Sequence, residues 1–391
     1  VLLNRGGYSY LTGPAVPGKE KQEAAPAPGG STPSLPWTVR IGSVVLTGNR
    51  AEYGLLNHRP AAGFDPSFIA LSTLDLAVDS IYNRGADIAL QIRRMAFTER
   101  SGLTVSDMTG DIGMDASGIS LAGVTLKTPF SRIEANISAG EGILALAPDS
   151  PLKAALTADV NTKDLKYLYP ALIPPVLDGR IVSLALTAAG TLGDIGKAGL
   201  DISSPGHVAF TADGAARNVL DPGRMEASAR FEGDFRDMAF LEALLPDSAL
   251  RRRIAIPDRI RLRGTAGADK GAFSAASTLS ADGGEIALQG RLDTRSEAYG
   301  IELRCDSFPL NSFLPADSLG LIDLALQAGG SGFDPLRAQT RGNIRLQVDR
   351  AEFRGRDFGG VELNANLEGG QLSGRLSDRD EALRLLLLVS G

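Results

Sequence analysis

The sequence predicts a mainly β fold: an elongated, repetitive β-sheet groove of the β-taco or solenoid-like type, with short helices between strand blocks. One observation behind this prediction is a block that recurs three times, at 164–174, 235–246 and 308–315. Each copy is a short helix-like stretch that ends at Leu-Pro or Ile-Pro. The final prolines, Pro174, Pro246 and Pro315, lie 72 and then 69 residues apart. A period of about 70 residues indicates stacked units that share a continuous surface.

The second observation is a one-sided alternation of apolar and polar residues in the strands after these blocks. Val182, Leu184 and Leu186 alternate with small or hydroxyl-bearing residues, as a strand with one buried face requires. The same phase returns at 322–326, 344–348 and 361–363. The segment 260–264, Ile-Arg-Leu-Arg-Gly, is shorter and more polar but keeps this phase. One apolar face and one wet face are therefore expected along these strands.

Taken in order, the chain divides into four parts. Residues 1–13 form a strand-like start, and 14–36 form a flexible loop rich in Pro and Gly. Residues 37–155 form a β-rich segment of short strands with Gly or Asp turns, at intervals of roughly ten residues. Residues 156–391 hold the β-rich repeats of about 70 residues with their short Leu-Pro helices. We place each short helix as a cap at a sheet edge or over the groove.

Composition narrows the class of protein. Of the 391 residues, 43% are hydrophobic and 6% aromatic, and 46 are Gly, which suits short strands and tight turns better than helix bundles. The net charge of −6 argues against a nucleic-acid partner, which usually meets a basic surface. The single cysteine, Cys305, has no partner for an internal disulfide. The longest fully apolar run, 385–389, is far shorter than the ~20 residues of a transmembrane helix.

The sequence offers few residues that could form a catalytic site. We therefore expect that the protein is not an enzyme and that it binds no cofactor and no metal. The only two histidines, His58 and His207, are far apart in sequence and are interpreted as exposed turn residues. Paired acids such as Asp107 with Asp111, or Asp378 with Asp380, would suit a glycosidase on a β-helix, but Asp is common at strand ends and turns.

A one-sided apolar sheet either closes over itself as a dry core or curls into an open trough. A dry core wants large, interlocking side chains, whereas this face is mostly Leu, Ile, Val and Ala, which suits a smooth groove. Such a groove would hold acyl chains by non-directional burial. The closed-core alternative stays open for each residue. The candidate lining residues are Val182, Leu184, Leu186, Ile322, Leu324, Leu326, Ile344, Leu346, Val348, Val361 and Leu363.

Several phrases resemble the TamB branch of the AsmA-like envelope proteins. They are Val39-Arg-Ile-Gly-Ser-Val-Val-Leu-Thr-Gly-Asn-Arg-Ala-Glu-Tyr53, then 64–71, Gly102-Leu-Thr-Val, 124–131 and 351–363, together with the Leu-Pro blocks. The resemblance covers roughly 37–391 and rests on diffuse patterns. It implies a periplasmic bridge in a Gram-negative bacterium, tethered to the inner membrane by a segment absent here. Its groove would carry phospholipid towards the outer membrane, or support outer-membrane protein assembly with a barrel partner of the Omp85 type.

The chain lacks an initiator methionine and opens directly in a strand-like phrase, so we expect an internal fragment of a longer protein. It departs from the resembled family in lacking both the N-terminal anchor and the C-terminal domain. Two rival hypotheses remain: a structural or adhesive β-array that binds protein or glycan, and a β-helix carbohydrate enzyme.

Overall fold

The computed structural model describes most of the chain. The described residues are 2–5, 8–11, 38–55, 58–115, 118–140, 148–170, 173–191, 193–219, 221–245, 248–315, 317–334, 337–378 and 386–390. The loop expected at 14–36 lies outside them. The structure separates into two compact units, one formed by residues 1–145 and 150–184 and the other by 146–149 and 185–391.

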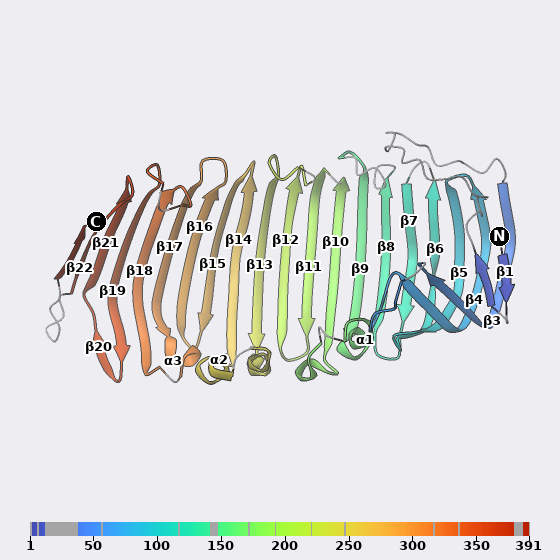
Figure 1. Ribbon diagram of the computed structural model, residues 1–391, viewed down its shortest axis with the longest axis horizontal. Helices are drawn as coiled ribbons and strands as arrows, with labels where there is room; N and C mark the ends of the chain where they lie inside the picture. Colours follow the sequence, from blue (N-terminus) through green and yellow to red (C-terminus); the bar gives the residue numbers. More distant parts are fainter. Residues whose placement is uncertain are drawn as a thin grey trace. The chain divides into compact units, whose positions relative to one another are not determined.

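The first unit is an antiparallel sheet in which each strand pairs with the next one along the chain (Figure 1). Its strands are β3 (Thr38–Gly54), β4 (Phe68–Arg84), β5 (Asp87–Glu99), β6 (Thr104–Asp115), β7 (Gly118–Lys127), β8 (Arg132–Gly140) and β9 (Pro151–Asn161). A separate two-stranded sheet pairs β1 (Leu2–Arg5) with β2 (Tyr8–Leu11). The unit also holds the helix α1 (Thr162–Leu168) and the 3-10 helix η2 (Pro175–Leu177).

The strand β10 (Ile181–Thr191) begins in the first unit and ends in the second. The second unit continues as consecutive antiparallel strands that lie side by side in chain order (Figure 1). They are β11 (Asp194–Ser204), β12 (Val208–Arg217), β13 (Glu226–Arg236), β14 (Arg259–Asp269), β15 (Ala272–Ala281), β16 (Gly284–Asp293), β17 (Ala298–Pro309), β18 (Leu319–Ser331), β19 (Arg341–Phe353), β20 (Arg356–Phe358), β21 (Val361–Glu368), β22 (Gln371–Ser377) and β23 (Leu386–Ser390). The predicted fold class, a mainly β chain built as a long open antiparallel sheet with few short helices, is confirmed.

The 70-residue period corresponds to four strands and one short helical segment. Along the chain, β10 to β13 separate α1 from the 3-10 helix η3 (Met238–Leu244), which is followed by α2 (Ser248–Arg253). The strands β14 to β17 then separate α2 from α3 (Leu310–Phe313). Because neighbouring strands are antiparallel, β13 and β17 run in the same direction. The helical segments that follow them therefore lie at the same margin of the second unit.

The first predicted helix is shorter than its sequence block. It ends at Leu168, where the Tyr169 N–H donates to the Leu165 carbonyl (2.7 Å), well before Pro174. Its start is fixed by Asn161, whose side chain accepts from the Lys163 N–H (2.9 Å) and caps the first turn. Pro175 instead begins η2, where the missing N–H costs nothing.

The first unit encloses part of its apolar face. Val105 is 2% exposed, and Val78 and Ile92 are also buried. Buried polar groups near α1 satisfy one another. The Asp164 carboxylate accepts from the hydroxyls of Thr128 and Ser131, both at 2.5 Å, so the buried charge keeps hydrogen-bond partners.

A second buried carboxylate, Asp65, organises the segment between β3 and β4. It accepts from the Ala61 N–H (2.8 Å) and the Ser67 N–H (2.9 Å), and its Oδ2 lies 2.6 Å from Nε2 of His58. These hydrogen bonds, above all the one from Ala61, lower the pKa of Asp65 to about 2. The segment is held against α1, since the Phe64 N–H donates to the Leu168 carbonyl (3.0 Å).

In the second unit the buried hydrophobic residues gather where β15 to β18 meet α3. Ala281, Cys305 and Phe308 form the centre, and Phe308 stacks on Phe313 of α3 with ring centroids 5.1 Å apart. The helices of this margin also contact each other. The Ala255 N–H donates to the Phe313 carbonyl (2.9 Å), and Arg253 pairs with Asp317 (3.1 Å).

Replacing Phe308 with Ala should destabilise the second unit by ~3–5 kcal/mol, because a 4% exposed ring leaves a cavity beside α3. The matched control is Phe353→Ala, whose ring is 40% exposed and whose loss should shift stability by only ~0.5 kcal/mol. Urea unfolding followed by circular dichroism measures both. Equal shifts for the two variants would show that the cluster at α3 does not hold this margin.

Asp65 predicts an acid-sensitive step in the first unit. Its pKa is below the ordinary value of 3.8, so its contribution to stability is complete above about pH 4 and is lost as the pH falls towards 2. The midpoint temperature of thermal unfolding should therefore fall less steeply between pH 6 and pH 2 for Asp65→Asn than for the wild type. Identical pH profiles would contradict this role.

Candidate functional site: an open apolar face

Strand register gathers the apolar side chains of the second unit on one face of its sheet. Residues directly opposite each other in β11 to β21 form four rows across the strands, which we call rows A to D. Row A is Ile202, Phe210, Gly233, Leu262, Leu279, Ile286, Cys305, Leu324, Val348 and Val361. Row B is Leu200, Ala212, Phe231, Gly264, Ser277, Leu288, Leu303, Leu326, Leu346 and Leu363.

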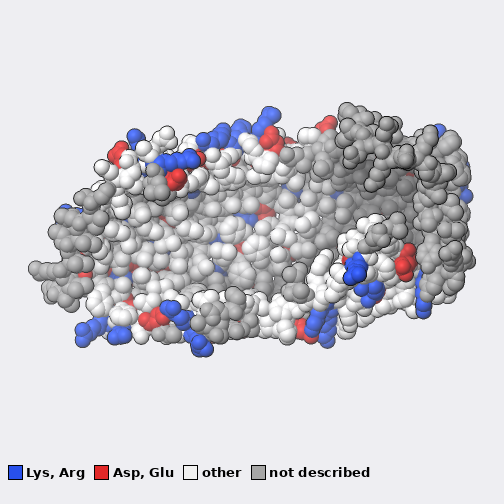
Figure 2. Space-filling view, viewed as in Figure 1, with Lys and Arg blue, Asp and Glu red and all other residues white. Residues whose placement is uncertain are grey.

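The remaining two rows approach the opposite ends of the strands. Row C is Ala198, Gly214, Ala229, Ala266, Ala275, Gly290, Ile301, Ala328, Ile344 and Ala365, and row D is Ile195, Ala216, Ala227, Ala268, Phe273, Leu292, Tyr299, Gly330, Gly342 and Leu367. No position in the four rows carries a charge, and only Ser277 and Tyr299 bring a hydroxyl. In Figure 2 the visible face of the second unit is hollowed and mainly uncharged, with charged residues gathered at its margins.

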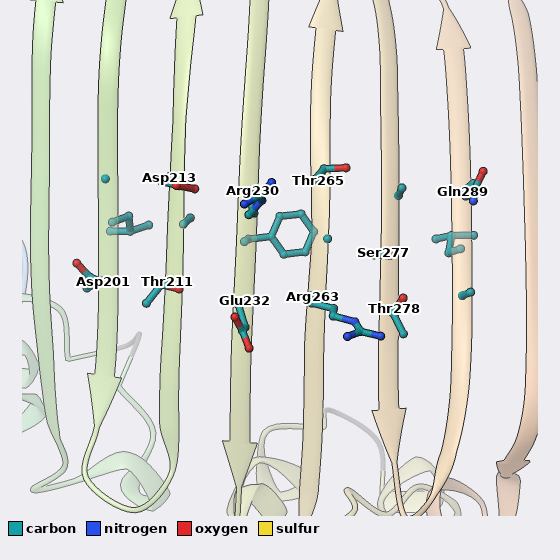
Figure 3. Close-up of a pocket in the computed structure, with 18 residues that line it drawn as sticks. Asp201, Thr211, Asp213, Arg230, Glu232, Arg263, Thr265, Ser277, Thr278 and Gln289 are labelled. Carbon is teal, nitrogen blue, oxygen red and sulfur yellow. The ribbon is translucent and has the colours of Figure 1, made fainter.

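Between these rows, every second residue belongs to the polar face. Asp213 stands directly opposite Arg230, and Glu232 directly opposite Arg263. Opposite charges at facing positions stabilise a sheet modestly and fix its register. Figure 3 shows the polar side chains of this region along β11 to β16. Arg263 reaches across β15 to Glu285, with 3.9 Å between Nη2 and Oε2. The charges are thus confined to the side of the sheet opposite the four rows.

Eight of the eleven predicted lining residues lie together on this face. Leu324, Val348 and Val361 are neighbours in row A, and Leu326, Leu346 and Leu363 are neighbours in row B. Ile344 belongs to row C, and Ile322 packs against the cluster at α3. Leu186 lies apart from them, on β10, and Val182 and Leu184 lie on the part of β10 that belongs to the first unit.

The face is open to solvent at the predicted residues. None of the eleven is fully buried, and Leu186 and Ile344 remain 39% and 44% exposed. A dry core would have left these large aliphatic side chains nearly inaccessible. Over the second unit, then, the apolar face forms a trough.

Over β10 to β14 the trough is lined mainly by small residues. Ala198, Gly214, Ala229 and Ala266 of row C leave a hollow of about 490 Å³ that is bounded by larger side chains, Leu200 and Phe273 among them. Volumes of 300–1,000 Å³ are typical of sites that take small molecules. With hardly a polar atom in its walls, this hollow suits an apolar occupant.

The two margins of the trough differ. On one margin, Leu279, Ile286 and Leu324 of row A pack, together with Leu310 and Phe313 of α3, against the buried centre formed by Ala281, Cys305 and Phe308. Burial in this cluster raises the pKa of the Cys305 thiol, which keeps it neutral. The opposite margin consists of hairpins. There Tyr299 of row D stacks on Phe333, which is 59% exposed, with 6.2 Å between ring centroids.

Aromatic side chains cover glycines on this face, a feature not predicted from the sequence. Phe231 lies over Gly264, where an added Cβ would come within 2.7 Å of the ring. Tyr299 lies over Gly330 in the same way, with its hydroxyl 2.8 Å from such a Cβ. A glycine opposite an aromatic residue leaves room for the ring to lie flat on the sheet. The signal is a cross-strand pair, so it becomes visible only once the register is known.

The other residues singled out from the sequence do not converge on one site. His58 is exposed, whereas His207 is half-buried and meets the Phe240 ring edge-on at 5.4 Å, which corrects its assignment as an exposed turn residue. Asp107 pairs with Lys127 at 3.7 Å, and Asp380 lies outside the described residues. Over the described ranges, no group of His, Cys, Asp or Glu is placed to hold a metal ion. None of the helices described there is long and apolar enough to cross a membrane.

Comparisons of this chain with protein families, with curated proteins and with solved structures find no match.

Proposed function

We propose that this chain is a non-enzymatic segment that carries phospholipid along the apolar face of its second unit. The observation that supports the proposal most is the trough itself: four adjoining rows without a charge, open to solvent at large aliphatic side chains. Exposed apolar surface of this extent marks an interaction site. Each buried CH₂ of an acyl chain would contribute about 0.8 kcal/mol without requiring any particular partner residue.

The uniformity of the rows favours movement of the cargo. Neighbouring strands lie about 4.8 Å apart, so a chain that shifts by one strand meets the same kind of surface again. Row B passes from Leu288 to Leu303, Leu326, Leu346 and Leu363 on successive paired strands. No polar group along this path would trap the cargo.

The cellular setting follows from the resemblance to the TamB branch and is part of the same proposal. The chain would work in the periplasm of a Gram-negative bacterium, between the inner and outer membranes, with its anchor in another segment. The same face would alternatively support outer-membrane protein assembly beside an Omp85-type barrel. A structural or adhesive array that binds protein or glycan remains the second candidate, since an apolar face also suits a protein partner.

A pair of photo-crosslinkers on one strand tests the proposal. A photoreactive amino acid at position 326, in row B, should capture phospholipid in cells, whereas one at position 327, on the polar face of the same strand, should not. The adducts are identified by mass spectrometry. Because the two positions are adjacent, protein abundance and location are matched. Adducts only with protein at position 326 would favour the adhesive array, and equal lipid capture at both positions would contradict the trough.

A further inference from the structure

The two margins of the trough give a bound lipid a direction. We infer that phospholipid lies with its acyl chains along the strands, their ends towards α3 and the headgroup at the hairpin margin beside Tyr299 and Phe333. The inference rests on the proposed function and specifies how the same face is occupied. It follows from the width of the rows, from what covers each margin and from the chemistry of the hairpin lip.

The width of the free surface matches one acyl chain. Successive rows are two residues apart along a strand, or about 6.8 Å, so rows B to D span about 14 Å. Half of a hydrocarbon core about 30 Å thick gives about 15 Å for one chain in a leaflet. An acyl chain laid along the strands therefore fills the free rows from the α3 margin to the hairpin margin. Laid across the strands, it would leave its headgroup over uncharged surface.

The α3 margin meets the rows with a packed apolar cluster, and its ion pairs, such as Arg253 with Asp317 (3.1 Å), are not part of that cluster. Row A is partly buried there, because Leu279, Ile286 and Leu324 pack, together with Leu310 and Phe313 of α3, against the buried centre that includes Cys305 and Phe308. A phosphate pushed against this cluster would lose its hydration without gaining a charged partner at the apolar surface. The end of an acyl chain would only extend the packed cluster.

The hairpin margin has the chemistry of a membrane interface. Tyr299 places an aromatic ring on the apolar rows, and aromatic residues with a polar tip are enriched at the boundary between acyl chains and headgroups. Ion pairs stand at two other places on this margin: Lys270 with Glu226 (2.8 Å), and Arg341 with Glu368 (3.6 Å). Both pairs are exposed, so cations for a phosphate and carboxylates for a headgroup amine are available at this lip.

Two photoreactive phospholipids test the orientation. The probes are a phosphatidylcholine with a diazirine at the end of one acyl chain and a phosphatidylethanolamine with a diazirine on its headgroup. The purified chain is loaded from vesicles of these two lipids and irradiated, and the adducts are mapped by mass spectrometry. The acyl probe should label Leu288, Leu303 or Leu326 of row B, which borders the packed residues of row A, and the headgroup probe should label Tyr299, Phe333 or Arg341. Exchanged or evenly spread patterns would overturn the orientation, and no adduct of either probe on rows A to D would count against the proposed function itself.

A matched pair of substitutions gives an independent test. Phe333→Ala removes the exposed ring that stacks on Tyr299 at the hairpin lip, and Phe353→Ala removes an exposed ring at the end of β19 away from that lip. Loading with the acyl probe should fall severalfold for Phe333→Ala, which loses the aromatic surface at the lip, and stay at the wild-type level for Phe353→Ala. Both side chains are exposed, so the unfolding midpoints should stay close to that of the wild type. Equal effects of the two substitutions, including no effect of either, contradict the orientation.

Discussion

The constraint on which the second unit depends is the uninterrupted register of its central strands, β12 to β17. From β12 to β17 every consecutive pair is aligned without a bulge, so each apolar residue stands opposite another apolar or small residue. A slip of one residue in any of these pairs would turn the side chains of a strand to the other face. Arg263 or Glu232 would then point into the trough. The uncharged surface is thus a property of the pairing as much as of the composition.

The strands of the first unit also alternate apolar and polar residues, but bulges interrupt the pairing between these strands. Bulges occur in most of its strand pairs, for example between Leu46 and Asn49 on β3. Bulges bend and twist a sheet. This unit buries Val78, Ile92 and Val105 and carries hydrogen-bonded carboxylates, Asp65 and Asp164, near α1. An alternating strand pattern is therefore compatible with an enclosed face in one unit and an open face in the other.

This difference marks how far the sequence could predict the structure. Alternation such as Ile344, Leu346 and Val348 shows which residues of one strand share a face, because that depends on the strand alone. The rows over β12 to β15 were missed because most of their residues are Ala or Gly, which carry little hydrophobic signal. The role of Gly264 depends on Phe231 of another strand, and the hydrogen bonds of Asp65 depend on the conformation of its loop. Whether a face is open depends on contacts that no local pattern records.

The block of four strands and a short helix has a consequence for how such a chain can change in length. Neighbouring strands are antiparallel and a block has four of them. After a block is duplicated or deleted, the next strand therefore starts at the same end of the sheet and runs in the same direction as before. The next helix then falls on the margin where α2 and α3 already lie, and the alternation continues in phase. Gain or loss of an odd number of strands would reverse the direction of every strand that follows and would move the next helix to the hairpin margin. Evolution by whole blocks can lengthen this surface and leave its two borders distinct.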